Sequence, residues 1–388
     1  MASVNTDQPH LPSATRLASV ESFRVVAMLI VVCIHANFLA RLHVEGGDYG
    51  FVIDFPLYLL WWLTVPYFFL VAGYFYGQKI QGGQQPLPVL GSSCASLLWL
   101  YLIWSAIYTV IPRHWLKAFS EGRVSQVLFS DTWPAGVLEH VKLIVLPWPP
   151  YYHMWFLPAL MVGLTTVAIA TLWRLEKRTV PLLVALYIFV IGAEVLQPRT
   201  GVEFNPIRAT SLAMFFTLLG WWVSDRRPIS ARLAGSLIIG GSALAVAEGI
   251  VLKTALDLPA IRVAFYPYAG AALLVLGLFL LLLSKPTWGQ HTILPALARY
   301  TLGVYVGHIF IEHTLAPIHD QLPHLPVVWY VPYVMTVYGL SLLLTWALMQ
   351  IPWLRALVVR DKSSPAGAFE RVWLWARFRW SHARYRQS

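Results

Sequence analysis

The chain is poor in charged residues. Asp, Glu, Lys and Arg make up 12% of its 388 residues, whereas soluble domains carry about 25%. Hydrophobic residues make up 58%, and the mean hydropathy is +0.62. Because a water-soluble surface is hard to build from this composition, soluble enzymes and nucleic-acid-binding modules are disfavoured. The composition indicates an integral membrane protein, and we expect no nucleic-acid partner.

Cysteine is also scarce, and the motifs that hold metals or nucleotides are missing. Cys33 and Cys94 both lie in apolar runs, where a disulfide framework has no use. We find no Cys or His cluster with metal-ligand spacing. No Gly-rich phosphate loop precedes a helix. The sequence therefore predicts no metal, no nucleotide hydrolysis and no tightly bound cofactor.

Long apolar segments fill most of the chain. A helix needs about 20 mostly apolar residues to cross the hydrocarbon core, and ten segments approach that length. The runs are continuous rather than alternating, which favours helices over a transmembrane barrel. We therefore expect an all-α polytopic transmembrane helical bundle of about ten spans. The segments are 22–40, 54–77, 89–111, 152–173, 179–197, 208–224, 231–252, 263–284, 293–315 and 327–350.

The positions of the basic residues predict the orientation of the bundle. Short loops rich in Lys and Arg stay in the cytoplasm. Such residues gather after the fourth, sixth and eighth segments, and Lys79 follows the second. Both termini are then cytoplasmic. We expect an N-terminal tail at 1–21, a transmembrane domain at 22–350 and a basic tail at 351–388.

The basic tail holds most of the positive charge. It contains eight Lys and Arg residues against two acidic residues, while the whole chain has a net charge of +10. Aromatic and aliphatic residues recur at helical spacing between the arginines. This pattern favours an amphipathic helix on the anionic lipids of the inner leaflet. The alternative is a solvated segment that only anchors the topology.

Two ionisable residues share one face of the first segment. Arg24 and His35 are eleven residues apart, which in a helix corresponds to about 16 Å along the axis and a rotation within about 20° of full turns. An ionisable side chain inside a membrane costs about 3 kcal/mol on insertion scales, so it needs a partner or a wet cavity. The pair suits a cleft that holds an anionic ligand at its mouth and reacts at its end. The alternative is a snorkelling arginine and a hydrogen-bonded core histidine.

Other polar and aromatic residues occur near the ends of later segments. His153 and Trp155 begin the fourth segment, and Tyr305 and His308 lie one helical turn apart in the ninth. Aromatic residues at these positions are typical of an interfacial belt. Glu312 follows His308 by four residues, which is consistent with a base and its carboxylate or with a solvated helix end. Three further ionisable residues lie within segments or near their ends, where each is expected either to contact substrate or to pair with another residue structurally: Arg208, Glu194 and Glu248.

The order of these motifs resembles the membrane-bound acyltransferase-3 family, whose members include bacterial enzymes that O-acylate surface polysaccharides, lipopolysaccharide O-antigens and periplasmic glucans. The resemblance covers residues 17 to about 350. Two departures are Ala72, where many members have Ser, and the absence of paired arginines before the third segment, where residues 79–99 offer only Lys79. The matching motifs are Arg24 and His35, Phe68-Phe69 with Gly73-Tyr74, His153 to Leu160, and Leu302 to His308.

The resemblance implies a reaction and its substrates. An acyl group, most commonly acetyl, moves from cytoplasmic acyl-CoA to a sugar hydroxyl of an extracytoplasmic polysaccharide or lipid-linked glycan, in the bacterial inner membrane. We hypothesise that His35 is the general base or the acyl acceptor. Arg24, with Lys79, binds the donor. The expected acceptor-binding residues are His308, Tyr305, His153, Trp155 and Arg208.

A secondary transporter is the competing interpretation. It also needs about ten spans and buried ionisable residues around a central site, but it predicts an inverted repeat. The two halves of the sequence do not correspond, so we favour the enzyme.

Overall fold

The computed structural model describes residues 17–38, 50–111, 115–122, 153–200, 205–226, 230–254, 268–352 and 354–358. All regular structure within these residues is helical, which confirms the predicted all-α class. The helices are α1 (Ala18–His35), α3 (Gly50–Gln81), α4 (Pro86–Val110), α5 (Trp115–Ser120), α8 (Phe156–Leu172), α9 (Thr179–Thr200), α10 (Asn205–Ser224), α11 (Ala231–Thr254), α13 (Ala269–Ser284), α14 (Leu294–Leu297), α15 (Thr301–Thr314), α16 (Ala316–His319) and α17 (Tyr330–Gln350).

Each of the ten expected segments contains a helix, but fewer of the helices meet the length and composition of a membrane span. Among the described residues five do so, or six if α8 and the following helix, bent by 120°, form one span. Helix α13 has 16 residues, and at 1.5 Å per residue it falls short of a core about 30 Å thick. The chain is therefore a multi-pass membrane protein. The count of ten and the cytoplasmic termini stay predictions.

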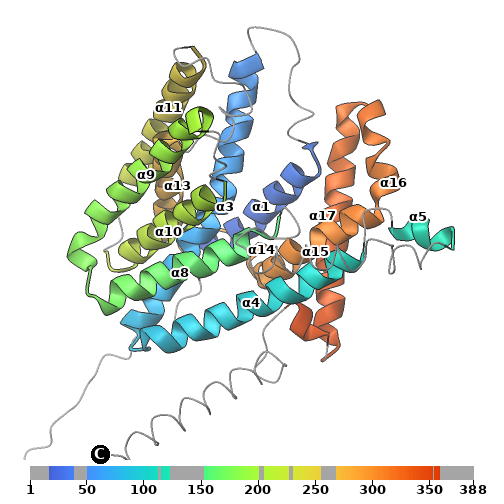
Figure 1. Cartoon of the computed structure of the whole chain (residues 1–388), viewed down its shortest axis with the longest axis horizontal. Coiled ribbons are helices and arrows are strands. Elements are labelled where there is room, and N and C mark those ends of the chain that lie inside the picture. Colours follow the sequence, from blue (N-terminus) through green and yellow to red (C-terminus); the bar gives the residue numbers. More distant parts are fainter. Residues whose placement is uncertain are drawn as a thin grey trace, which may run out of the picture.

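Helix α1 lies between two groups of helices (Figure 1). One apolar core is formed mainly by α3, α4, α8, α10 and α13. A second core forms where α1 meets α15 and α17. Because α1 contacts both groups, its faces are set by packing rather than by lipid. This places the segment that carries Arg24 and His35 in the interior of the bundle.

Two hydrogen bonds set the position of α1 along its axis. The Tyr67 hydroxyl on α3 donates to the carbonyl of Val20 at 2.8 Å. The Ser19 hydroxyl donates to the carbonyl of Leu282, at the end of α13, at 2.7 Å. Tyr67 is fully buried and Ser19 nearly so. Such bonds hold strongly in a water-free interior, because an unpaired carbonyl there is costly.

Glu248 has a structural role in this fold. Its carboxylate accepts hydrogen bonds from the backbone N–H groups of Ala269 and Gly270, at 3.1 and 2.9 Å. These groups begin α13, where the first N–H groups of a helix lack partners within it. A carboxylate also complements the positive end of the helix dipole. Glu248 therefore pairs structurally, while the side chain of Glu194 lies outside the described residues.

The chain after α17 returns to α4. The indole N–H of Trp99 donates to the carbonyl of Ala356 at 2.9 Å, and that of Trp104 donates to the carbonyl of Leu357 at 2.7 Å. Ala356 and Val358 are buried. Residues 359–388, which hold most of the expected basic tail, lie outside the described part of the chain, as do residues 1–16 and 123–152.

Glycines allow α3 and α10 to pack backbone against backbone. A Cβ atom added at Gly73 would lie 2.0 Å from the carbonyl oxygen of Thr217, and one added at Gly220 would lie 2.0 Å from that of Leu70. Both distances are far below van der Waals contact. Gly163 of α8 meets the same turn of α10, where its Cβ would lie 2.7 Å from the Thr217 hydroxyl. The Gly73 of the sequence motif is thus a packing residue that brings three helices together.

We expect Gly73→Ala to destabilise the protein, because α10 must move away from α3 to admit a methyl group. Overpacking of this kind costs about 1–3 kcal/mol. Gly91→Ala in α4 is the matched control, since nothing lies within 4 Å of a Cβ at that position. There the better helix propensity of Ala leaves stability unchanged or raises it by up to about 1 kcal/mol. Thermal unfolding in detergent, followed by tryptophan fluorescence, compares the two, and equal melting temperatures would contradict the packing argument.

Candidate active site

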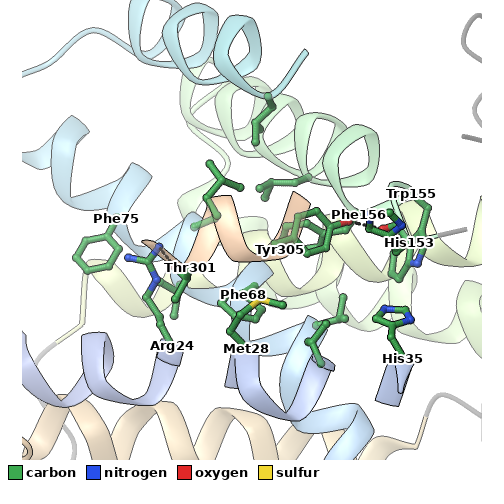
Figure 2. A pocket seen from close by; sticks show the side chains of 17 residues that line it. Arg24, Met28, His35, Phe68, Phe75, His153, Trp155, Phe156, Thr301 and Tyr305 are labelled. Carbon is green, nitrogen blue, oxygen red and sulfur yellow. Dashed lines mark hydrogen bonds between the residues drawn. The ribbon is translucent and has the colours of Figure 1, made fainter. Parts of the chain in front are cut away.

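A cavity of about 250 Å³ runs along one face of α1 (Figure 2). From α1 it is lined by Arg24, Met28, Val31 and His35, whose spacing of four, three and four residues is that of a single helical face. The predicted shared face of Arg24 and His35 is therefore confirmed. The other lining residues are Val65, Phe68, Val71, Ala72, Phe75, Leu97, His153, Trp155, Phe156, Leu160, Thr301, Leu302 and Tyr305.

The two ends of the cavity differ in chemistry. Figure 2 shows the Arg24 guanidinium beside Thr301 and Phe75 at one end, and His35 near His153 and Trp155 at the other. The wall between them is mainly apolar and includes Met28 and Phe68. Only the ends therefore offer polar groups for binding or reaction. An extended ligand with a charged end and an apolar stretch fits such a shape.

Arg24 is oriented by a threonine at the start of α15. One of its terminal nitrogens donates to the Thr301 hydroxyl oxygen at 3.2 Å. The Thr301 hydroxyl in turn donates its proton to the carbonyl of Ala298 at 2.8 Å, so its oxygen is left as an acceptor for Arg24. A guanidinium carries five N–H donors. Because the threonine accepts from one of them, a neutral hydroxyl orients the side chain.

Three histidines from three distant parts of the chain meet at the other end. The ring centroids of His35 and His308 are 5.1 Å apart, those of His153 and His308 are 5.4 Å apart, and those of His35 and His153 are 6.2 Å apart. His153 and His308 are buried. His35 and His153 line the cavity, whereas His308 is not among its lining residues and packs against both rings. The site thus offers several imidazoles within reach of one another.

The backbone of α15 fixes the tautomer of His308. Its Nδ1 lies 2.7 Å from the carbonyl oxygen of Tyr305 and 3.1 Å from that of Val304. Carbonyl oxygens only accept hydrogen bonds, so Nδ1 carries the proton and donates it. The lone pair of the neutral ring then resides on Nε2. That atom is buried and makes no hydrogen bond to the described residues.

Two tyrosines hold the histidine cluster from outside. The Tyr305 hydroxyl donates to the backbone carbonyl of His153. The Tyr108 hydroxyl donates to the carbonyl of Val306 at 2.5 Å and accepts from the N–H of Phe310 at 3.2 Å. Those two backbone groups are the partners of a regular helical bond. Tyr108 of α4 therefore bridges the turn of α15 that carries His308, and its ring lies 5.1 Å from that of His153.

The remaining predicted site residues have varied positions. Trp155 lines the cavity, as does Ala72 of the second motif. Lys79 is exposed in the last turn of α3 and is not among the lining residues. Arg208 lies on α10, and its side chain is outside the described residues. The Glu312 carboxylate lies 3.9 Å from a ring nitrogen of His319, whereas His308 bonds to the backbone of its own helix.

Sequence reasoning missed Thr301 and Tyr108. Neither position carried a signal, because a threonine at a helix start and a tyrosine in an apolar run are ordinary features of membrane helices. Their roles follow from contacts with residues about 200 or more positions away. Among the described residues, no group of three His, Cys, Asp or Glu side chains is arranged to hold a metal ion. The expectation of no metal stays a prediction.

We expect Tyr108→Phe to lower the free energy of unfolding by about 1 kcal/mol, since it removes the hydroxyl that bridges the backbone of α15. The control is Tyr101→Phe on the same helix. Tyr101 is also buried, and its hydroxyl makes no hydrogen bond within the described residues. Thermal unfolding in detergent measures both variants. If Tyr101→Phe lowers the melting temperature as much as Tyr108→Phe, the bridge contributes nothing specific.

Comparison with known proteins agrees with the arrangement of these motifs. A curated protein from Enterococcus gallinarum called serine/alanine racemase is 24% identical over 213 residues, which cover 52% of this chain and 27% of that protein. The chain therefore spans well under two thirds of the length of that relative. No solved structure matches the chain. A family model described as an acyltransferase domain, that of acyltransferase-3, matches residues 17–349. This match covers most of the chain and every described helix that lines the cavity. The chain therefore belongs to the acyltransferase-3 family.

Proposed function

We propose that the protein is a membrane O-acyltransferase of the bacterial inner membrane. It takes an acyl group, acetyl in the first instance, from acyl-CoA in the cytoplasm and transfers it to a sugar hydroxyl of an extracytoplasmic or lipid-linked polysaccharide. The observation that carries this proposal is the cavity with Arg24 at one end and His35 at the other. Family membership supplies the reaction class.

Arg24 is the donor-binding residue in this proposal. Its planar guanidinium binds phosphate oxygens in a bidentate manner and stays charged when buried. The apolar wall beyond it, with Met28 and Phe68, suits the uncharged part of an acyl-CoA. Lys79, exposed at the end of α3, attracts the anionic donor to the same side of the membrane. CoA itself is a co-substrate and not a resident cofactor.

His35 performs the transfer at the far end of the cavity. As a general base, it takes the proton of the acceptor hydroxyl while that oxygen attacks the thioester directly. As a nucleophile, it forms the bond to the acyl group itself and passes it on in a second step. Both routes use a ring nitrogen of His35 and release CoA as a thiol. Position alone does not separate them.

The acceptor sugar binds near the histidine end. Trp155 and Tyr305 line this part of the cavity and offer aromatic faces on which sugars stack. His153 supplies a hydrogen-bonding group beside them. Arg208 remains a candidate contact, and the basic tail is proposed to bind anionic lipids of the inner leaflet.

A secondary transporter is the alternative function. It also uses a cavity lined by charged residues, but transport requires the cavity to open to each side in turn. Vesicles that contain the protein and take up labelled sugar without acyl-CoA would favour it. Transfer of label from acetyl-CoA to a glycan, without net sugar uptake, supports the enzyme.

We expect His35→Ala to abolish acyl transfer. Removing the reacting imidazole costs about 10²–10⁴-fold in rate or more. The assay uses purified protein in nanodiscs with labelled acetyl-CoA and a glycan fraction extracted from bacterial membranes, and it records CoA release and label in the glycan. His324→Ala, at an exposed histidine outside the cavity, is the matched control. Turnover by His35→Ala at the wild-type rate excludes a chemical role for His35.

Arg24→Lys tests whether the donor is held by a bidentate contact. Lysine keeps the charge but loses the planar pair of donors, so kcat/KM for acetyl-CoA is expected to fall about 10-fold to 100-fold, or about 1.4–2.7 kcal/mol. Arg232→Lys, at an exposed arginine of α11, is the control and should leave kcat/KM unchanged. Near-wild-type transfer by Arg24→Lys would show that charge alone is enough.

A further inference from the structure

We infer that His308 is a second catalytic base, which deprotonates the acceptor hydroxyl, and that His35 is therefore the residue that carries the acyl group. The inference rests on the proposed acyltransferase function. It adds an assignment that the position of His35 leaves open, since it separates direct transfer from a covalent intermediate.

The backbone of α15 holds the His308 ring in one tautomer. Its Nδ1–H donates to the carbonyl oxygens of Tyr305 and Val304, so its Nε2 is the basic atom. Nε2 is fully buried and makes no hydrogen bond to the described residues. A buried polar atom without a partner is costly. A substrate hydroxyl that donates a hydrogen bond to Nε2 would supply the missing partner, and Nε2 could then take its proton.

The same hydrogen bonds stabilise the ring after it takes a proton. A protonated imidazole keeps its Nδ1–H, and the two carbonyl oxygens at 2.7 and 3.1 Å then accept charge-assisted bonds. This orientation of a histidine by an acceptor at Nδ1 is the arrangement found in catalytic triads, where a base at Nε2 is held by a partner at Nδ1. Tyr108 acts as a positioning residue, because it bridges the Val306 carbonyl and the Phe310 N–H on either side of His308.

His308 packs against the ring of His35, with centroids 5.1 Å apart, yet it is not among the residues that line the cavity from Arg24. The donor enters through that cavity in the proposed function. A base for the second step must lie next to the ring that holds the acyl group and close to the proposed acceptor site. His308 meets both conditions, since its ring centroid lies 5.1 Å from that of His35 and 6.3 Å from that of Tyr305.

Two imidazoles allow a two-step reaction. In the first step a ring nitrogen of His35 attacks the thioester carbonyl, a C–N bond forms, the C–S bond breaks, and the proton of the imidazole ends on the departing CoA sulfur. In the second step the acceptor oxygen attacks the acyl carbonyl, and its proton goes to Nε2 of His308. The C–N bond breaks, and its electron pair returns to His35. Transfer of the proton from His308 to His35 restores both rings. With one base only, His35 would have to hold the acyl group and accept the proton together.

The test is His308→Gln, compared with His35→Ala and with His324→Gln as a control at an exposed histidine. Protein in nanodiscs is mixed with labelled acetyl-CoA, and the first turnover is quenched rapidly. We expect His308→Gln to release about one equivalent of CoA and to retain label on the protein, at a rate within a few-fold of wild type. Transfer of that label to the membrane glycan fraction should fall about 100-fold or more. His35→Ala should show neither step.

Hydroxylamine provides a second measurement. It attacks an acylimidazole without help from a base, so it should remove the label from His308→Gln at the same rate as from wild type. Label on the protein also demonstrates that the variant is folded, because acylation needs the assembled cavity. Added imidazole should restore part of the transfer to the glycan.

Two results would overturn the inference. If His308→Gln slows first-turnover CoA release as much as glycan transfer while its melting temperature stays at the wild-type value, His308 only positions His35. If His308→Gln transfers acetyl to the glycan at the wild-type rate, it has no part in the reaction. A wild-type protein that releases no CoA from acetyl-CoA contradicts the proposed function itself, which is a separate outcome.

Discussion

The site depends on the packing of α1 between two apolar cores. Arg24 and His35 share a face because of helical geometry alone, but that face lines a cavity only because neighbouring helices enclose it. The hydrogen bonds from Tyr67 to Val20 and from Ser19 to Leu282 fix the axial position of α1. A shift of one turn, about 5.4 Å, would move His35 away from His308 and His153. The enclosing helices are in turn held together by the glycine contacts of α3 and α10.

Polar groups in this interior are arranged by backbone as much as by side chains. Thr301 uses the carbonyl of Ala298 to present a lone pair to Arg24. His308 uses two carbonyls of its own helix to fix its tautomer. A membrane interior has little water to form hydrogen bonds with such groups. Breaking either arrangement would therefore leave buried polar groups without partners, which is costly. This is how a largely apolar bundle keeps a few reactive groups in fixed orientations.

The sequence predicted the features that depend on local period and order. Ten apolar segments all contain helices, and the eleven-residue spacing of Arg24 and His35 predicted their common face. His153, Trp155 and Tyr305 were found through motif order and do line the cavity. The sequence could not predict the roles of Tyr108, Thr301 and Glu248. Each role depends on a partner in another helix that no local pattern encodes. The four-residue spacing offered His308 as one neighbour of Glu312, whereas the structure places the Glu312 carboxylate 3.9 Å from His319 of the next short helix.

In the proposed function, the division of the cavity into charged, apolar and imidazole regions suits transfer of an acyl group better than passage of the whole donor. Moving a charged donor through a wall lined by residues such as Met28 and Phe68 would cost several kcal/mol, because charges are poorly tolerated at membrane depth. A short uncharged acyl group meets no such barrier. If the donor stays anchored at Arg24 and only its acyl end reaches His35, the group crosses by bond exchange. The helices then need no rocking motion, which agrees with an α1 that is hydrogen-bonded to α3 and α13.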